Sequence, residues 1–490
     1  MAWFHAPDYW LSRLLFERAL AAIYVVAFLV AVNQFRPLLG ERGLLPVPRF
    51  VAAVSARRSP SIFRLHYSDR FLSVVAWVGV AASVTIVAGL PQAGPAWVPM
   101  LAWFLVWGLY LSIVNVGQTF YSFGWETLLL EAGFLAMFLG PSRSPPPVLV
   151  IWLLRWLLFR IEFGAGLIKI RGDACWRNLT CLDYHHETQP MPNPLSWYFH
   201  RLPKPVHRAE VAGNHLTQLV VPFLLFAPQP VAGVAALFVV ATQGWLILSG
   251  NFSWLNWATL ILGVTALRDD WLGKVFPFEH GALSDPSGWF VGMVLAVAAL
   301  MAVLSFWPIR NLLSRRQLMN ASFNPLRLVN TYGAFGSITK VRHEVVIEGT
   351  DEPEVTPSTA WKEYGFKGKP GDPKRRPPQV APYHLRLDWL MWFAAMASPT
   401  SHPWIITFIQ RLLEGDSATL KLLRRDPFPL APPTFVRASF YRYRFTTRRE
   451  RKETGTWWDR TYIGPYLPPL ALRARVGATR GEGNTMKEGI

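Results

Sequence analysis

Residues 148–170 read VLVIWLLRWLLFRIEFGAGLIKI, an apolar run interrupted by a few charged side chains. A helix needs about 20 residues to cross the ~30 Å hydrocarbon core of a bilayer, so this run predicts a membrane-spanning helix. Comparable runs recur along the chain, and the sequence therefore predicts a polytopic α-helical membrane protein with about eight or nine spans. The expected spans are 15–35, 71–90, 98–116, 125–140, 148–168, 211–227, 231–249, 253–267 and 287–307.

Composition supports this class. The chain has 490 residues, of which 51% are hydrophobic and only 16% are charged. The N-terminal MAWFHAPDYW lacks the basic start and the cleavage site of a signal peptide, so the first span is expected to be retained. The net charge is +18, and residues 311–490 hold most of the excess. This charge suits a solvated domain near anionic lipid headgroups, whereas nucleic-acid binding is not expected because no recognition motif accompanies it.

The loop between the first two expected spans carries many positive charges. Cytoplasmic loops are enriched in Lys and Arg, so residues 36–70 are predicted to be cytoplasmic. Residues 91–97 contain no Lys or Arg and are expected on the opposite side of the membrane. The charges of the first loop are Arg36, Arg42, Arg49, Arg57, Arg58, Arg64 and Arg70.

Beyond the last expected span the pattern changes from apolar runs to period-two alternation. KVRHEVVIEGTDE (340–352), HLRLDWLMWF (384–393) and SFYRYRFTTR (439–448) alternate, which is typical of half-buried strands. WIITFIQRLLEG (404–415) is predicted as a helix between them. We therefore expect a transmembrane domain over residues 1–310, which includes the 170–210 loop. A β-rich extramembrane domain is expected over 320–470 and a disordered tail over 471–490.

Three charged residues of the 148–170 run share one helix face. Arg155, Glu162 and Lys169 are spaced by seven residues, a spacing that drifts only about 20° around a helix. Charged groups at membrane depth normally face the bundle interior or water. One interpretation is internal ion pairing, for which Glu126 and Glu131 are candidate partners, with Lys169 snorkelling at the span end. The other is a polar cavity in which Lys169 acts as a base or as an anion contact.

The two cysteines of the chain, Cys175 and Cys181, follow this run within LIKIRGDACWRNLTCLDYHHETQPMPNP (167–194). Two cysteines with His185 or His186 make four ligands arithmetically, but the spacing matches no standard zinc pattern. A disulfide closing a short loop is the favoured prediction, with free thiols as the alternative. We predict neither a metal site nor a cofactor.

The segment DYHHETQPMPNP (183–194) is predicted as a loop because successive X-Pro steps oppose a regular helix. A loop at the mouth of a span commonly binds something, and a stiff connector is the alternative. Serine-nucleophile elbows, P-loops, dinucleotide fingerprints and HExxH motifs are absent, so no enzyme class is indicated. The candidate loop contacts are His185, His186, Gln189 and Asn193.

Several stretches resemble the lipase maturation factor family. They are GWETLLLEAGFLAMFLGP, the CWRNLTC–QPMPNP region, NFSWLNWATL, YGAFGSITKVRHEVVIEGTDE and APYHLRLDWLMWFAA. The resemblance implies a multi-span membrane protein of the endoplasmic reticulum, or of the inner membrane if the chain is bacterial. It implies a chaperone-like role in bringing a secreted, exported client such as a homodimeric lipase to its active form. Membrane lipids and this client are the expected partners.

A fainter likeness concerns Lys169, Gly172 and Trp176, whose arrangement is similar to the membrane domain of the vitamin K-dependent γ-carboxylase. It implies an alternative function, a membrane enzyme that uses Lys169 as a base on a lipid or quinone-type substrate. In the maturation-factor reading, exposed aromatic residues of the C-terminal domain are expected to contact the client. The alternative is that they form the core of that domain. These aromatics are Tyr332, Phe335, Trp361, Tyr364 and Phe366.

Overall fold

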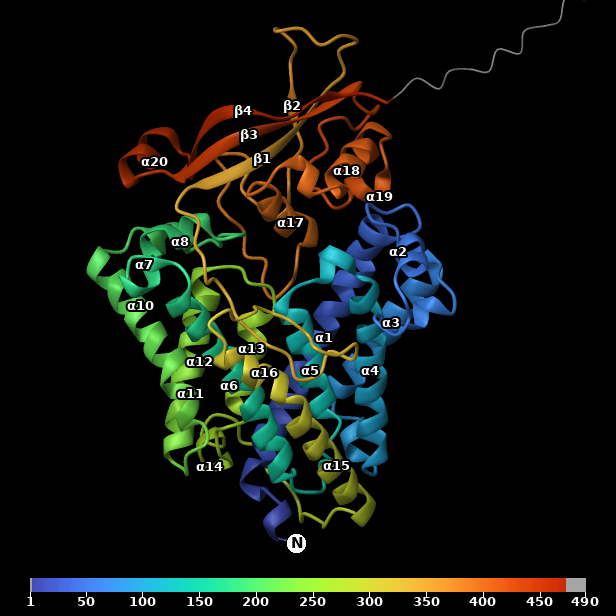
Figure 1. The fold of residues 1–490 in the computed structure, drawn as a ribbon, viewed down its shortest axis with the longest axis vertical. Helices are drawn as coiled ribbons and strands as arrows, with labels where there is room; N and C mark the ends of the chain where they lie inside the picture. Colours follow the sequence, from blue (N-terminus) through green and yellow to red (C-terminus); the bar gives the residue numbers. More distant parts are fainter. Residues whose placement is uncertain (1, 473–490) are drawn as a thin grey trace, which may run out of the picture.

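The computed structural model describes residues 2–472 of the chain. A bundle of helices forms one end of the molecule, and a small β-sheet lies across the other end (Figure 1). The predicted helical membrane protein with a C-terminal sheet domain is therefore confirmed at this level. The predicted disordered tail falls, from residue 473 onward, outside the described residues.

Within residues 2–472, five helical segments are long and apolar enough to cross a membrane. Each overlaps an expected span, because a continuous apolar run of about 20 residues is the strongest sequence signal for a spanning helix. Two of the segments include a short neighbouring helix, at the start of α1 and at the end of α15. The segments are Pro7–Leu39 with α1 (Trp10–Leu39), α3 (Asp69–Val87), α4 (Trp97–Val116), α12 (Val231–Ser249), and Gly288–Leu313 with α15 (Gly288–Leu304) and α16 (Phe306–Leu313).

The remaining expected spans correspond to helices of a different kind. The helix α6 has 24 residues but carries several charges, whereas α5 and α13 have only 13 and 10 residues. At 1.5 Å per residue, the two short helices reach only about half to two thirds of the bilayer thickness. The count of eight or nine spans stays a prediction. These helices are α5 (Gly124–Ala136), α6 (Val148–Arg171), α10 (Lys204–Leu219), α11 (Val221–Leu224) and α13 (Leu255–Val264).

Short helices connect these elements, and most of them lie near the ends of the bundle (Figure 1). The helices α7 and α8 follow α6 and lie at the end of the bundle that carries the sheet. α7 holds Cys175 and α8 holds His185 and His186, while Cys181 directly precedes α8. The connecting helices are α2 (Val47–Ala53), α7 (Ala174–Arg177), α8 (Leu182–Thr188), α9 (Ser196–His200), α14 (Asp269–Leu272), α19 (Ser417–Leu420) and α20 (Arg448–Thr454).

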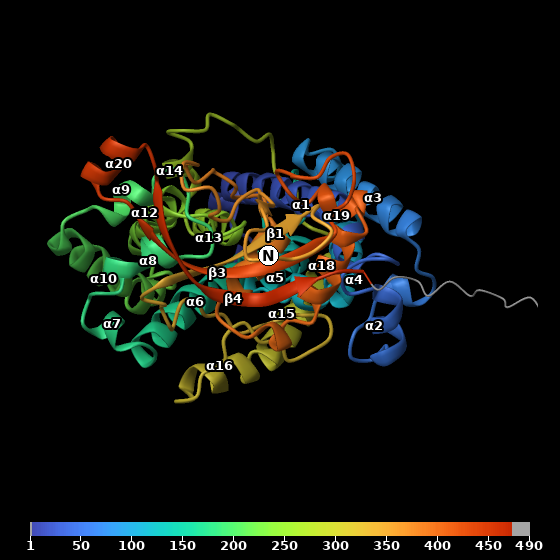
Figure 2. The same ribbon diagram turned by 90° about the horizontal axis from the view of Figure 1, so that it is seen from above.

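The sheet is antiparallel with strand order β2-β1-β3-β4. Its strands are β1 (Arg342–Thr350), β2 (Lys362–Glu363), β3 (Phe435–Phe445) and β4 (Trp458–Leu470). In the register of the central pair, Val345 lies opposite Phe440 and Ile347 opposite Ala438. Seen from above, β1, β3 and β4 run across the middle of the bundle (Figure 2). The strands predicted at 340–352 and 439–448 are confirmed, as is the helix within 404–415, which is α18 (Trp404–Leu413).

Two local predictions are wrong. HLRLDWLMWF forms the helix α17 (Arg386–Ala394) rather than a strand. Most of α17 is buried, and its charged residues are buried too. Its sequence therefore lacks the separate polar and apolar faces of an amphipathic helix, and the alternation of polar and apolar residues wrongly predicts a strand. DYHHETQPMPNP is not a loop throughout, because α8 runs to Thr188 and ends just before the first X-Pro step.

Two buried arginines connect the sheet domain to the bundle. Arg386 on α17 donates from Nη1 to Glu126 Oε1 on α5 over 2.8 Å. Gln34 of α1 binds the same turn, since its side chain accepts from the Arg386 amide (2.9 Å) and donates to the His384 carbonyl (2.7 Å). Arg342 on β1 donates to the backbone carbonyls of Glu187, Gln189 and Pro190, at the end of α8 and just beyond it. The sheet is thereby fixed over one end of the bundle.

Candidate functional site

A cavity of about 1000 Å³ lies between the bundle and the sheet domain. Its walls come from α6, α10, α12 and α13, from the α8 region, from residues 332–339 and from α17. Most of the lining is apolar, with aromatic side chains such as Phe252, Trp389 and Trp392. A large apolar cavity with a few convergent polar groups is the usual form of a ligand site.

Lys169 projects from the end of α6 into this cavity. It is buried, and its Nζ donates to Asn214 Oδ1 and to Gln218 Oε1, each over 2.8 Å. Asn214 and Gln218 are four residues apart on α10, so both amides lie on one face of that helix and reach the same ammonium group. The ammonium group also lies 4.9 Å from the centroid of the Trp176 ring. Lys169 is therefore held by neutral acceptors and an aromatic face.

Glu162 lies two turns earlier on the same face of α6 and is also buried. It accepts from Gln243 Nε2 (2.7 Å) and from Gln218 Nε2 (3.2 Å). Gln243 in turn accepts from Asn256 Nδ2 over 2.7 Å. Gln218 thus bridges Glu162 and Lys169, and a chain of hydrogen bonds runs from α13 to the end of α6. The sequence identifies Glu162 and Lys169 as candidate site residues but does not identify the amide side chains that bind them. The available signal for such an amide is a single polar residue within an apolar run.

Arg155, the third residue of the predicted stripe, lies outside the cavity. Its Nη1 donates to the carbonyl of Leu225 over 3.2 Å, and its guanidinium carbon lies 5.2 Å from the Tyr9 ring centroid. Leu225, which supplies the acceptor, directly follows α11. Of the three predicted stripe residues, Glu162 and Lys169 therefore line the cavity, whereas Arg155 contacts other parts of the bundle.

The expected carboxylate partners of the stripe bind other arginines, which corrects the ion-pairing prediction. Glu126 pairs with Arg386 of α17, and Glu131 pairs with Arg160 of α6. Tyr332 also donates to Glu131 over 2.9 Å. The reason is geometric: Arg160 lies on a different face of α6 from the stripe, and that face is the one that meets α5.

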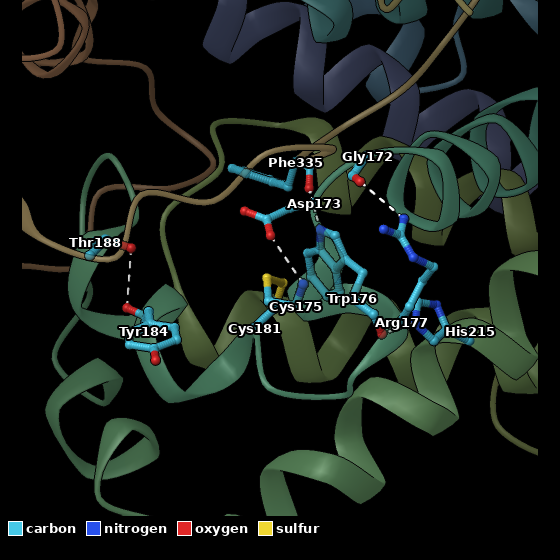
Figure 3. The surroundings of a disulfide bond; sticks show 10 residues. All are labelled: Gly172, Asp173, Cys175, Trp176, Arg177, Cys181, Tyr184, Thr188, His215 and Phe335. Carbon is cyan, nitrogen blue, oxygen red and sulfur yellow. Dashed lines mark hydrogen bonds between the residues drawn. A yellow bond between two sulfur atoms is a disulfide. The ribbon is translucent and has the colours of Figure 1, made fainter. Parts of the chain in front are cut away.

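The loop after α6 contains a disulfide between Cys175 and Cys181 (Figure 3). Both residues are buried, and their Cα atoms are 4.8 Å apart. Asp173 begins the short helix α7, because its side chain accepts from the amide of Cys175 over 3.0 Å. The disulfide therefore closes a compact turn directly after Lys169.

This turn supports one wall of the cavity. The indole Nε1 of Trp176 donates to the carbonyl of Phe335 over 2.8 Å (Figure 3), and the amide of Asp173 donates to the Gly336 carbonyl over 2.8 Å. The backbones approach so closely that a Cβ at Gly172 would clash with the Gly336 carbonyl. The glycines at the end of α6 and in YGAFGS thus allow the two backbone segments to pass close to each other.

The four candidate loop contacts lie in different surroundings. His185 lines the cavity, with its ring 5.0 Å from that of Phe335, and burial together with the charge of Lys169 lowers its pKa to about 3. His185 is accordingly neutral near pH 7. Gln189 donates to the Ser249 carbonyl (3.0 Å) and Asn193 to the Leu248 carbonyl (2.9 Å), so both attach the segment to the end of α12.

The fourth residue, His186, points toward α10. There its ring nitrogens approach His207 and Glu210, and the candidate ligand atoms of the three residues lie within 4.8 Å of one another. No metal site was predicted from the sequence, because these residues come from two helices separated by a connector and form no recognisable motif.

The aromatics predicted as an exposed client surface are not exposed as a set. Tyr332, Tyr364 and Phe366 are each less than 5% exposed, so the prediction of exposure is wrong for these three. Phe335 is half-buried in the cavity wall, and Trp361 is half-buried with the guanidinium of Arg437 4.1 Å from its ring centroid. Large aromatic side chains bury more apolar area than most others, and Tyr332, Tyr364 and Phe366 are accordingly part of the buried core.

Comparisons with known proteins cover nearly the whole chain. Residues 11–274 match the family model described as the lipase maturation factor transmembrane domain, and residues 328–468 match the lipase maturation factor C-terminal domain. Lipase maturation factor 1 of Bos taurus is 44% identical over 95% of this chain and 90% of its own length. The Mus musculus protein of the same name is 43% identical over 96% and 88%. Lipase maturation factor 2 of Homo sapiens is 28% identical over 94% and 83%. No solved structure matches the chain significantly.

Proposed function

Because the chain belongs to the lipase maturation factor family, we propose that it is a chaperone-like membrane factor that helps an exported client, such as a lipase, reach its active form. The observation that carries this proposal is the match of both domains at 43–44% identity along nearly the full length of relatives named for lipase maturation. An integral membrane location is supported by the five apolar helices. We place the protein in the endoplasmic reticulum membrane of a eukaryote or the inner membrane of a bacterium.

The structure supports an orientation that suits an exported client. The disulfide joins Cys175 of α7 to Cys181 at the start of α8, and these two helices lie at the end of the bundle that carries the sheet (Figure 1). Disulfides persist mainly in oxidising compartments. We therefore infer that the sheet domain faces the exported side, where the client folds.

This orientation conflicts with the predicted cytoplasmic location of residues 36–70. That loop lies at the same end as the sheet, since Arg42 is within 3.9 Å of Glu414, which follows α18. The disulfide and the first loop are therefore on one side of the membrane, and an oxidising side for the cysteines and a cytoplasmic side for the loop cannot both hold. We give more weight to the disulfide.

The proposal is tested by co-expression with a homodimeric secreted lipase in cells that lack a maturation factor. We expect the full-length protein to raise the activity per secreted lipase mass. A monomeric secreted enzyme serves as the control and should not respond. If the protein accumulates in the membrane while the active fraction of the lipase stays unchanged, the proposed client class is wrong.

One observation favours the alternative of a membrane enzyme: Lys169 faces a cavity large enough for a lipid or a quinone-type molecule. The hydrogen bonds of Lys169 argue against its use as a base. Its Nζ is engaged by two amide oxygens of α10 and by the Trp176 ring, so protein groups already surround it, whereas a general base must come within hydrogen-bond reach of the proton that it removes. The same geometry suits an anionic headgroup of a membrane lipid better than proton abstraction.

A further inference from the structure

A group of three metal-ligating side chains lies at the rim of the cavity, between α8 and α10. His186 comes from α8, and His207 and Glu210 come from the first half of α10. One ligand atom from each lies within 4.8 Å of the others, and the rings of His186 and His207 have centroids 5.6 Å apart. His207 and Glu210 are three residues apart, which places both on one face of α10.

These histidines are buried without sufficient hydrogen-bond partners. His186 is 3% exposed and His207 is 2% exposed. Within residues 2–472, three of their ring nitrogens have no hydrogen-bond partner. They are both nitrogens of His186 and the Nε2 of His207. Buried polar side-chain atoms are usually paired, so these unpartnered imidazole nitrogens beside one carboxylate point to a ligand, to which each neutral ring can offer one lone pair. The cysteine sulfurs of the preceding loop are not candidate ligands, because Cys175 and Cys181 are bonded to each other.

The carboxylate of the group is already oriented. Glu210 Oε1 accepts from the indole Nε1 of Trp245 on α12 over 2.8 Å, and its Oε2 lies 2.9 Å from His207 Nδ1. Hydrogen bonds of this kind fix the direction of a ligating group before a metal arrives. A cation between His207 and Glu210 would replace their mutual contact with two metal bonds.

We propose that His186, His207 and Glu210 form a binding site for Zn²⁺. Two imidazole nitrogens and one carboxylate oxygen are a common donor set for this ion, with bonds of about 2.0–2.2 Å. Side-chain movements of about 1 Å bring the three ligand atoms within reach of one ion. His186 and Glu210 also line the cavity, so the fourth coordination position opens toward it. The ion links α8, and with it the disulfide loop, to α10.

This inference is independent of the proposed function, and its test measures the metal itself. The full-length protein is purified in detergent with a tag free of histidine and without chelators, and its zinc content is measured by mass spectrometry. Titration against a chromophoric chelator then gives the affinity, and Co²⁺ substitution reports the coordination through its visible absorption. We expect about one Zn²⁺ per chain and a tetrahedral Co²⁺ spectrum, as a site with three protein ligands and one open position implies.

His186→Gln and His207→Gln remove one ligand each while keeping a polar side chain. Loss of an outer-shell partner alone weakens metal affinity by about 10–100-fold, so loss of a ligand is expected to cost at least that much. The matched control is His215→Gln on the same helix, whose ring nitrogen lies 3.0 Å from the Trp176 carbonyl and which is not in the group. The His215→Gln variant should bind Zn²⁺ with the same affinity as the wild type. Wild-type protein that binds neither ion, or unchanged affinity in both ligand variants, overturns the proposal, and the wild-type measurement does not depend on any variant folding.

Discussion

Replacing Arg386 by methionine removes one partner of the buried ion pair that joins the two family domains. Arg386 and Glu126 are both fully buried, and their closest atoms are 2.8 Å apart. Arg386 also donates to the Phe120 carbonyl over 2.7 Å, and its guanidinium carbon lies 3.4 Å from the Tyr121 ring centroid. In Arg386→Met the carboxylate of Glu126 would remain buried without its cation.

The expected loss follows from this geometry. Breaking a buried pair by removal of one partner costs about 3–5 kcal/mol, because the remaining charge is uncompensated. A well-packed neutral replacement of both partners is often close to neutral. We therefore expect Arg386→Met to lower the free energy of unfolding by about 3–5 kcal/mol, and the double variant Arg386→Met with Glu126→Gln to recover a large part of this loss.

The measurement is denaturant unfolding in mixed micelles, followed by tryptophan fluorescence. The matched control is Arg449→Met, which makes the same substitution in the exposed pair of Arg449 and Glu453 and should change stability little. A loss below about 1 kcal/mol in Arg386→Met would refute the reasoning, since that is the range of an exposed pair. Additive losses in the double variant would refute it as well, because they would show that the two side chains are not coupled.

Three further predictions concern the cavity and the orientation. Lys169→Arg keeps the positive charge but cannot supply a neutral base. Under the proposed function, most of the yield of active client should therefore remain in the co-expression assay. Complete loss of this yield in a folded variant would favour the membrane enzyme. Replacing Cys175 and Cys181 by serine opens a turn with a sequence separation of 6 and should lower the unfolding free energy by roughly 2–3 kcal/mol, measured as above, with an unchanged value counting against the disulfide. Ser55→Cys introduces an exposed thiol into the 36–70 loop, and we expect a membrane-impermeant reagent to label it from the exported side. Labelling only from the cytoplasmic side would reverse the inferred orientation.

The elements that could be predicted from the sequence are those with local causes. α12 is recognisable because its apolar run is nearly the thickness of a bilayer, and β3 is recognisable because side chains alternate between two faces. α17 was predicted wrongly because it is short and buried nearly all round, so no polar face marks its helical period. A segment of nine residues enclosed by other elements takes its conformation from those contacts, not from its own pattern.

The same distinction holds at the site. Glu162 and Lys169 could be found because charged residues are conspicuous in an apolar helix. Their partners could not, because Gln218 lies 49 and 56 residues away on another helix and the register of α10 against α6 decides which amide arrives. The partner of Glu126 is 260 residues away, in the other domain. An ion pair between distant segments depends on how those segments pack against each other. The pattern and spacing of residues within one helix carry no information about that packing.

The conflict between the arginine-rich loop and the disulfide can be weighed by how the folded protein holds the charges of the loop. The positive-inside rule is a bias in the number of Lys and Arg near the ends of spans, and Asp and Glu contribute little to it. In the folded loop, Arg36 lies 3.4 Å from Asp69, and Arg42 lies near Glu414. Arg64 donates to the backbone carbonyls of Ser59 and Val54. Contacts of this kind lower the cost of holding the loop on the exported side once the protein has folded, whereas a disulfide has no comparable compensation in a reducing cytoplasm.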